Sequence, residues 1–321
     1  MIEYILFIIG LIILIKGADY LIEGSSSLAK KLKVSTLVIG LTIVAFGTSM
    51  PELIVNILAA LKGSTEVAFG NIIGSNIANI LLVLGIVAII NPIKVERSTI
   101  WKEIPFALLA VVVLFVVSNY LLIDNINITS LTRVSGLVML CFFAIFIYYV
   151  VNLAKNSKRQ LDNKELNIQK HSNLIIFLMI FSGLVGLYFG GKWVVEGAIF
   201  VAQQFGLSEF LISATIIAIG TSLPELVTGI KAAKKKDTGL AVGNSVGSNI
   251  FNIFWILGVT ALVAPIAIPV FINLDIFLLG IASFLLFIFL FIGKKHELEK
   301  WQGWIFILLY IIYILFIVLR G

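Results

Sequence analysis

The chain has 321 residues, of which 60% are hydrophobic and only 12% are charged, about half the charged share of an ordinary soluble chain. Apolar stretches of about 20 residues recur along it, and each is long enough to cross a bilayer as a helix. The composition therefore excludes a soluble fold and predicts a polytopic helical membrane protein. The net charge of +6 lies in the segments between the apolar stretches, which is typical of membrane topology and not of nucleic-acid binding.

Ten transmembrane helices are predicted, in two sets of five. The first set covers residues 4–23, 36–61, 66–90, 104–123 and 130–153, and the second covers 174–198, 209–231, 240–264, 270–292 and 302–319. The hydrophilic residues 154–173 are expected to form a solvated linker. We therefore predict a first unit at 1–153, a linker at 154–173 and a second unit at 174–321.

The two units repeat each other. An offset of 173 positions aligns residues 10–86 with 183–259 without a gap, most clearly between 40–86 and 213–259. The matched positions include Gly, Pro, Glu and Asn, which two unrelated apolar helices would not share. Because each unit has an odd number of spans, the second must enter the membrane from the opposite side. The predicted fold is an all-α membrane protein of two inverted five-helix repeats, with a substrate site near the midplane.

The charges between helices predict the orientation. Lysine and arginine concentrate in the connections after the first, third, fifth, seventh and ninth helices, including the linker. The positive side of a membrane protein is cytoplasmic. We therefore expect a multi-pass protein of the cell (plasma) membrane, with both termini outside and residues 154–173 in the cytoplasm.

The segment Gly47-Thr48-Ser49-Met50-Pro51-Glu52 interrupts an apolar helix, and Gly220-Thr221-Ser222-Leu223-Pro224-Glu225 repeats it. Proline has no N–H, so the carbonyl of Gly47 loses its helical donor. A carboxylate at bilayer depth costs ~2.5–3.5 kcal/mol on insertion scales, so its occurrence twice indicates function and not a simple proline kink. Carboxylate, hydroxyl and carbonyl oxygens are the ligands that Ca²⁺ and similar hard cations prefer.

A second repeated segment follows each of these. Residues 70–79 carry Ser75 and Asn79 four positions apart, and residues 243–252 carry Ser248 and Asn252. These side chains could complete the oxygen shell, or they could join helices by hydrogen bonds. Both interpretations are open for the other asparagines of the two segments, which are Asn71, Asn76, Asn244 and Asn249.

The charges near the ends of the helices 4–23 and 174–198 are less informative. Asp19, Glu23, Lys192 and Glu196 are interpreted as interfacial side chains that reach toward water. The glycines and other small residues of the same two helices would suit helices that slide against a core.

The chain lacks the signatures of several enzymes. It contains no His-Glu-x-x-His zinc helix and no phosphate-binding Gly-x-x-x-x-Gly-Lys loop. Ser49 and Ser222 have no neighbouring His or Lys in sequence that could act as a base. With Cys141 as its one cysteine, the chain can form neither an intramolecular disulfide nor a cysteine metal cluster. We expect no enzyme activity and no cofactor.

The paired Gly-Thr-Ser-x-Pro-Glu and Gly-Asn-x-x-Gly-Ser-Asn-Ile-x-Asn segments resemble the two repeats of the cation/calcium exchanger superfamily, most closely its prokaryotic sodium/calcium exchangers. The resemblance implies that helices 36–61, 66–90, 209–231 and 240–264 enclose the ion sites. It also implies that helices 4–23 and 174–198 slide across this core. The implied ligands of Ca²⁺ and Na⁺ are Glu52, Glu225, Thr48, Ser49, Thr221, Ser222, Ser75, Ser248, Asn79, Asn252, Ala45 and Ala218.

The sequence departs from part of the superfamily at Asn252, where the K⁺-dependent branch and some prokaryotic relatives carry Asp. The centre then holds a formal charge of −2, which one Ca²⁺ balances and three Na⁺ exceed by one. We expect a Na⁺/Ca²⁺ antiporter that works by alternating access, is electrogenic and K⁺-independent, and acts as a monomer in the bilayer. The alternatives are an H⁺/Ca²⁺ exchanger of the same fold and a cation channel.

Overall fold

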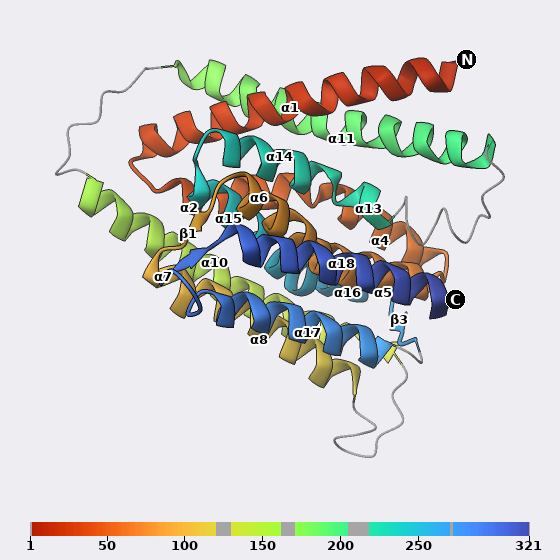
Figure 1. Ribbon diagram of the computed structural model, residues 1–321. Coiled ribbons are helices and arrows are strands. Elements are labelled where there is room, and N and C mark those ends of the chain that lie inside the picture. The colour runs from red at the N-terminus through yellow and green to blue at the C-terminus, as the bar shows by residue number, and fades with distance from the viewer. Residues whose placement is uncertain (1, 120–129, 162–170, 205–217, 270–271, 321) are drawn as a thin grey trace.

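The computed structural model describes residues 2–119, 130–161, 171–204, 218–269 and 272–320, and most of them lie in helices that run along one long axis (Figure 1). The first part of the chain forms α1 (Ile2–Leu32), α2 (Thr36–Ile39), η1 (Gly40–Val44), α3 (Ala45–Thr48), α4 (Met50–Leu61), α5 (Thr65–Ile77), η2 (Ala78–Leu84), α6 (Gly85–Ile90), α7 (Arg97–Trp101), α8 (Glu103–Ser118) and α10 (Arg133–Leu161). The second part forms α11 (Asn173–Gln204), α13 (Ala218–Thr221), α14 (Leu223–Lys234), α15 (Thr238–Ile250), η4 (Phe251–Leu257), α16 (Gly258–Val263), α17 (Ile272–Phe289) and α18 (Lys300–Arg320).

Eight helices of the described residues are long and apolar enough to cross a membrane. A ninth candidate is the pair Thr36–Thr48 and Met50–Leu61, which bends by 43° at Ser49. The chain is therefore an all-helical membrane protein with eight or nine candidate spans in its described part. The predicted helix 209–231 begins within residues 205–217, which lie outside the described residues, and α13 and α14 form its remainder.

Several helices continue beyond their predicted ends. The helix α1 ends at Leu32 and not at residue 23, and α10 ends at Leu161 and not at residue 153. At 1.5 Å per residue, α1 is about 46 Å long, which exceeds the ~30 Å hydrocarbon core. The prediction followed hydropathy, but lysine and similar polar residues are good helix formers, so the backbone stays helical outside the apolar stretch.

Four strands of two residues each were not predicted. The strand β1 (Ile93–Lys94) pairs antiparallel with β4 (Glu297–Leu298), and β2 (Ser130–Leu131) pairs antiparallel with β3 (Ile266–Ala267). Such short strands leave no alternation of apolar and polar residues that a sequence could reveal. They join the ends of helices that are far apart in the chain, at opposite ends of the molecule (Figure 1).

In the described part of the chain, three segments adopt π-helix within otherwise α-helical spans. The segments are η1, η2 and η4, and the last two, Ala78–Leu84 and Phe251–Leu257, occupy matching positions of the repeat. A π turn holds one more residue than an α turn and is frequent at functional sites. It changes the direction of the side chains that follow, so the face of each motif helix could not be derived from α-helical spacing alone.

The helices α1 and α11 lie against each other along one side of the molecule (Figure 1). Their contact contains a glycine at every seventh position of both helices. A Cβ on Gly17 would lie 2.8 Å from the Leu187 nitrogen, and one on Gly190 would lie 2.6 Å from the Leu14 nitrogen. The backbones therefore touch, as in other small-residue contacts of membrane helices. The glycines expected to suit sliding against a core instead face the partner helix: Gly10, Gly17, Gly24, Gly183, Gly190 and Gly197.

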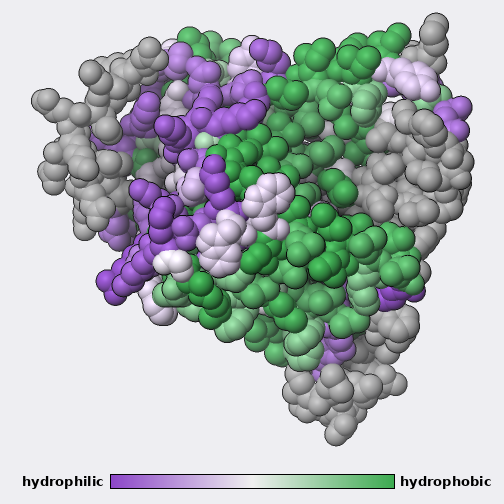
Figure 2. Space-filling model, in the orientation of Figure 1, coloured by the Kyte–Doolittle hydropathy of each residue, from purple (hydrophilic) through white to green (hydrophobic). Residues whose placement is uncertain are grey.

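The surface separates into two kinds of region. Figure 2 shows a broad hydrophobic face over α17 and α18, while hydrophilic residues gather toward the end of the molecule where β1 lies. On these two helices Phe277, Phe284, Leu308 and Leu315 are each more than half exposed. An apolar surface of this extent fits contact with lipid chains and not with water.

We predict that Gly190→Ala destabilises the protein and that Gly191→Ala does not. The added methyl at 190 meets backbone atoms at 2.6 Å, whereas at 191 the nearest atom is 3.8 Å away. Overpacking of this kind costs about 1–3 kcal/mol, which lowers the melting temperature by several degrees. Thermal unfolding of the two purified variants in detergent measures the difference. Equal melting temperatures would show that the α1–α11 backbones are not in contact.

Candidate functional site

The two motif helices break at the same point. Ser49, between α3 and α4, has φ −87° and ψ 8°, and Ser222, between α13 and α14, has φ −88° and ψ 5°. Proline is suited to the first turn of the helix that follows, because its missing N–H would have no partner there. The break therefore places Glu52 and Glu225 in a first helical turn, where the helix dipole favours a carboxylate. Their side chains are buried, with exposures of 0% and 1%.

The glycines of the two motifs accommodate side chains of α11. A Cβ on Gly47 would lie 2.2 Å from Leu184 Cδ2, and one on Gly220 would lie 2.3 Å from Val195 Cγ2. The sequence indicated only that the Gly47 carbonyl loses its helical donor. The structure adds a second requirement, since α11 passes against both breaks.

Serine hydroxyls bind both carboxylates. Ser75 Oγ donates to Glu52 Oε1 at 3.3 Å, and Ser248 Oγ donates to Glu225 Oε1 at the same distance. Ser49 Oγ, from the first motif, donates to Glu225 Oε1 of the second at 3.2 Å. The predicted meeting of the two motifs is thereby confirmed for these side chains.

Thr221 joins the same cluster, because its Oγ1 lies 3.3 Å from Ser75 Oγ. Each motif thus sends a hydroxyl toward the other half of the chain. The two buried carboxylates share one polar cluster, although like charges repel at short range in an apolar interior.

Four asparagines connect α5 and η2 to α15 and η4. Asn79 Nδ2 donates to Asn249 Oδ1 at 3.1 Å, and Asn252 Nδ2 donates to Asn76 Oδ1 at 3.0 Å. Asn249 Nδ2 donates to the Asn76 carbonyl at 3.2 Å, and Asn76 Nδ2 donates to the Asn249 carbonyl at 3.4 Å. Asn76 and Asn249 are therefore interhelical hydrogen-bond residues, and they hold the side chains of Asn79 and Asn252 in place.

Four buried oxygens of the cluster have no hydrogen-bond partner among the described residues. They are Glu52 Oε2, Glu225 Oε2, Asn79 Oδ1 and Asn252 Oδ1, which form two pairs related by the repeat. An unsatisfied buried polar group costs about 1–3 kcal/mol. Carboxylate and amide oxygens without donors are suited to a hard cation, which is bound through several oxygens at once.

The remaining predicted residues lie around this cluster with less direct contacts. Thr48 Oγ1 donates to Asn244 Oδ1 at 3.1 Å, and no described contact joins it to Glu52. Ser222 Oγ is buried without a partner among the described residues. The Ala45 carbonyl accepts the N–H of Ser49 at 3.1 Å. Ala218 begins α13, and its side chain lies outside the described residues.

One polar network was missed by the sequence analysis. Asn71 Nδ2 donates to Asn56 Oδ1 at 2.6 Å and to the Glu52 carbonyl at 3.4 Å, and Asn56 Nδ2 donates to the Ala68 carbonyl at 3.1 Å. The sequence could have indicated this network, because Asn56 is a polar residue in an apolar helix, and its side chain is buried. The aligned position of the second half is Gly229, so this network supports one motif only.

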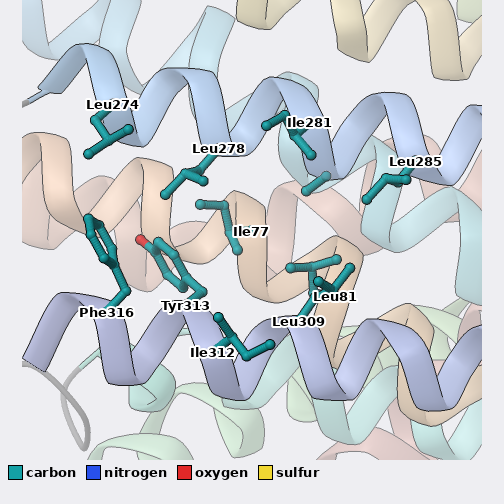
Figure 3. Close-up of a pocket in the computed structure, with 11 residues that line it drawn as sticks. Ile77, Leu81, Leu274, Leu278, Ile281, Leu285, Leu309, Ile312, Tyr313 and Phe316 are labelled. Carbon is teal, nitrogen blue, oxygen red and sulfur yellow. The ribbon is translucent and has the colours of Figure 1, made fainter.

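Two cavities of the described residues differ in character. One of about 300 Å³ lies between α17, α18 and the α5–η2 span (Figure 3). Apart from the Tyr313 hydroxyl, its lining side chains are hydrocarbon, so they cannot replace the hydration shell of a cation. The other, of about 260 Å³, is lined by Pro51, Thr221 and residues of α11. This groove reaches the polar cluster.

A membrane-embedded chain that buries two carboxylates among hydroxyls and amides, at the breaks of two helices, has the construction of a cation transporter. The family described as sodium/calcium exchanger protein matches residues 2–152 and 175–319. The chain belongs to this family, whose members are membrane transporters and not enzymes.

Similar proteins match the chain over almost its whole length. It is 36% identical over 317 residues to the putative antiporter CaxA of Alkalimonas amylolytica, covering 95% of each chain. It is 30% identical to the sodium/calcium exchanger MaX1 of Methanosarcina acetivorans, over 98% of this chain and 97% of the relative. A structure of the sodium-calcium exchanger NCX_Mj, soaked with Na⁺ and Ca²⁺, superposes with a TM-score of 0.82 at 33% identity and covers 98% of both chains.

We predict that Glu52→Gln and Glu225→Gln each weaken Ca²⁺ binding by at least about 100-fold, since breaking a buried charge pair costs about 3–5 kcal/mol. The matched control is Glu103→Gln. Glu103 is equally buried, on α8, but its carboxylate accepts from the Tyr149 hydroxyl and touches none of the cluster. Isothermal titration of the purified variants with Ca²⁺ measures the affinities. An unchanged affinity in the double variant Glu52→Gln/Glu225→Gln would contradict the site.

Proposed function

We propose that this protein exchanges Na⁺ for Ca²⁺ across the membrane by alternating access. The observation that carries the proposal is the set of four donor-free oxygens, on Glu52, Glu225, Asn79 and Asn252, buried in matched pairs. A site of this kind needs cation charge to keep both carboxylates ionised in an apolar interior. Membership of the sodium/calcium exchanger family supports the same substrates.

The two glutamates would be shared ligands of Ca²⁺ and Na⁺, so that one ion excludes the other. The hydroxyl or carbonyl oxygens of Thr48, Ser49, Thr221, Ser222, Ser75 and Ser248 would add further ligands, and the carbonyls of Ala45 and Ala218 would serve flanking Na⁺ sites. The site is neutral with one Ca²⁺ and carries +1 with three Na⁺, and in both loaded states the cations compensate the carboxylates so that the site can pass the apolar barrier. The bare site, with a formal charge of −2, cannot, and this penalty enforces exchange over leak.

The charge of the centre favours an electrogenic and K⁺-independent cycle. One Ca²⁺ balances two carboxylates, and an exchange of three Na⁺ for one Ca²⁺ would move one net charge. Asn252 supplies an amide oxygen in place of a third carboxylate, so no additional negative charge is present to hold K⁺.

The proposed topology has ten transmembrane helices in two inverted repeats, at 1–153 and 174–321, joined by a cytoplasmic linker at 154–173. The matching φ and ψ values at Ser49 and Ser222, and the matching π-helices η2 and η4, support a repeat. Both termini lie at the same end of the molecule (Figure 1). The clustered lysines at the ends of α1 and α14 support a cytoplasmic location of the opposite end. We propose that a single chain in the plasma membrane performs the cycle.

We predict that a Na⁺ gradient drives Ca²⁺ uptake by the reconstituted protein. Liposomes loaded with Na⁺ and diluted into Na⁺-free buffer should accumulate Ca²⁺, and valinomycin with K⁺ should alter the rate, because net charge moves. An H⁺/Ca²⁺ exchanger would respond equally to a pH gradient without Na⁺, and that result would contradict Na⁺ coupling. A channel would give Ca²⁺ flux that does not depend on a counter-ion.

We further predict that K⁺ is not required. With the membrane potential clamped, uptake should be equal in K⁺ and in choline buffers. Asn252→Asp adds a third carboxylate and should make the rate in K⁺ exceed that in choline. The matched control is Asn76→Asp, which adds the same charge at the asparagine that accepts from Asn252 Nδ2. A wild-type rate that needs K⁺ would contradict the charge argument.

A further inference from the structure

The groove of about 260 Å³ joins the surface of α11 to the ion site. Its lining includes Thr221, whose Oγ1 lies 3.3 Å from Ser75 Oγ, and Ser75 in turn binds Glu52. A cation in the groove is therefore separated from the buried carboxylates by a short chain of hydroxyls. The side chains that line the open part of the groove therefore act on an ion before it reaches the hydroxyls of Thr221 and Ser75.

Two charged residues of α11 line this groove. Lys192 Nζ and Glu196 Oε1 are 3.8 Å apart, one helical turn from each other, and their side chains are 52% and 55% exposed. The other lining residues that the structure describes carry no charge. An exposed ion pair of this kind contributes little to stability. Its effect is mainly on the potential that an approaching ion meets.

We infer that Lys192 and Glu196 are opposing determinants of cation selectivity at the mouth of the groove. The carboxylate attracts an entering cation and the ammonium group repels it. Coulomb energy is proportional to the charge of the ion. Removing one unit of charge at the mouth therefore changes the local concentration of Ca²⁺ by the square of the factor by which it changes that of Na⁺. The inference rests on the proposed function for the identity of the two ions.

The corresponding residues of α1 are arranged differently. Asp19 aligns with Lys192, and Glu23 aligns with Glu196. Asp19 forms an ion pair with Lys231 of α14 at 2.9 Å, and neither Asp19 nor Glu23 lines the groove. The interfacial interpretation stays a prediction for Glu23, Lys192 and Glu196, whose side chains are about half exposed, whereas Asp19 pairs with another helix. The pair at the groove mouth is a feature of α11.

The test uses the full-length protein in liposomes and compares Glu196→Gln with Lys192→Gln. At low ionic strength and a separation of ~10 Å, the loss of one charge should change the half-saturating Ca²⁺ concentration about fourfold and the half-inhibiting Na⁺ concentration about twofold. Glu196→Gln should raise both concentrations and Lys192→Gln should lower both. At 0.2 M salt the differences should nearly disappear, because the Debye length falls below 8 Å. Maximal rates should stay at the wild-type value.

Glu23→Gln is the matched control, since it removes the same charge from the aligned position of α1 and should change nothing. Shifts of the same sign in both α11 variants, or no shift at low salt, would overturn the inference. The Ca²⁺ measurement can be driven by whichever gradient supports uptake. Uptake driven only by a pH gradient would overturn Na⁺ coupling. The shifts in the half-saturating Ca²⁺ concentration would in that case still test the roles of Lys192 and Glu196. Wild-type protein without Ca²⁺ uptake under either gradient would overturn both proposals.

Discussion

The burial of two glutamates in one apolar interior is the constraint on which the rest of the structure depends. Among the described residues, neither Glu52 nor Glu225 bonds a lysine or arginine, and each keeps one oxygen without a donor. Two uncompensated carboxylates would be strongly destabilising in this setting. Serine hydroxyls moderate the charge, and the remaining compensation requires either protonation of a carboxylate or a bound cation. In the proposed function the cation provides it, and the stability of this arrangement would then be linked to the ion that it carries.

The asparagine network would let the proposed site keep its shape while it changes occupant. The side-chain amides of Asn76 and Asn249 each donate to the other's backbone carbonyl. Asn76 Oδ1 also accepts from Asn252 Nδ2, and Asn249 Oδ1 accepts from Asn79 Nδ2. All four groups are neutral, so the network adds no charge that an ion would have to balance. Asn76 and Asn249 use both side-chain groups in this network, while Asn79 Oδ1 and Asn252 Oδ1 stay without a partner among the described residues. A neutral network of this kind can hold two helices in register. The charged ligands are then free to respond to the ion.

The sequence was sufficient to identify the residues of the cluster but not its geometry. Glu52, Ser75 and their copies could be predicted because a polar residue in an apolar helix is costly and its repetition is improbable. The hydrogen bonds from Ser49 to Glu225 and from Asn79 to Asn249 could not be predicted, because they depend on how two helices cross. The hydrogen-bond partners of Ser75 and Asn79 could not be read from their spacing either, because η2 begins between them and is not α-helical.

The two halves match in sequence more closely than they match in packing. The three atoms nearest to a Cβ on Gly47 belong to Leu184, and those nearest to a Cβ on Gly220 belong to Val195, so α11 passes against both breaks. The aligned positions of α1 are Leu11 and Ile22, and neither supplies one of these nearest atoms.

Where the aligned residues are alike, a difference in their packing is a property of the conformation. If each half can adopt the packing of the other, the molecule has a second arrangement, in which α1 and not α11 passes against the two breaks. The Asp19–Lys231 ion pair would be lost in that exchange, because Lys192 and Leu58 occupy the aligned positions. The backbones of α1 and α11 are in contact along both helices, so in the proposed alternating-access cycle these two helices would move as one rigid pair.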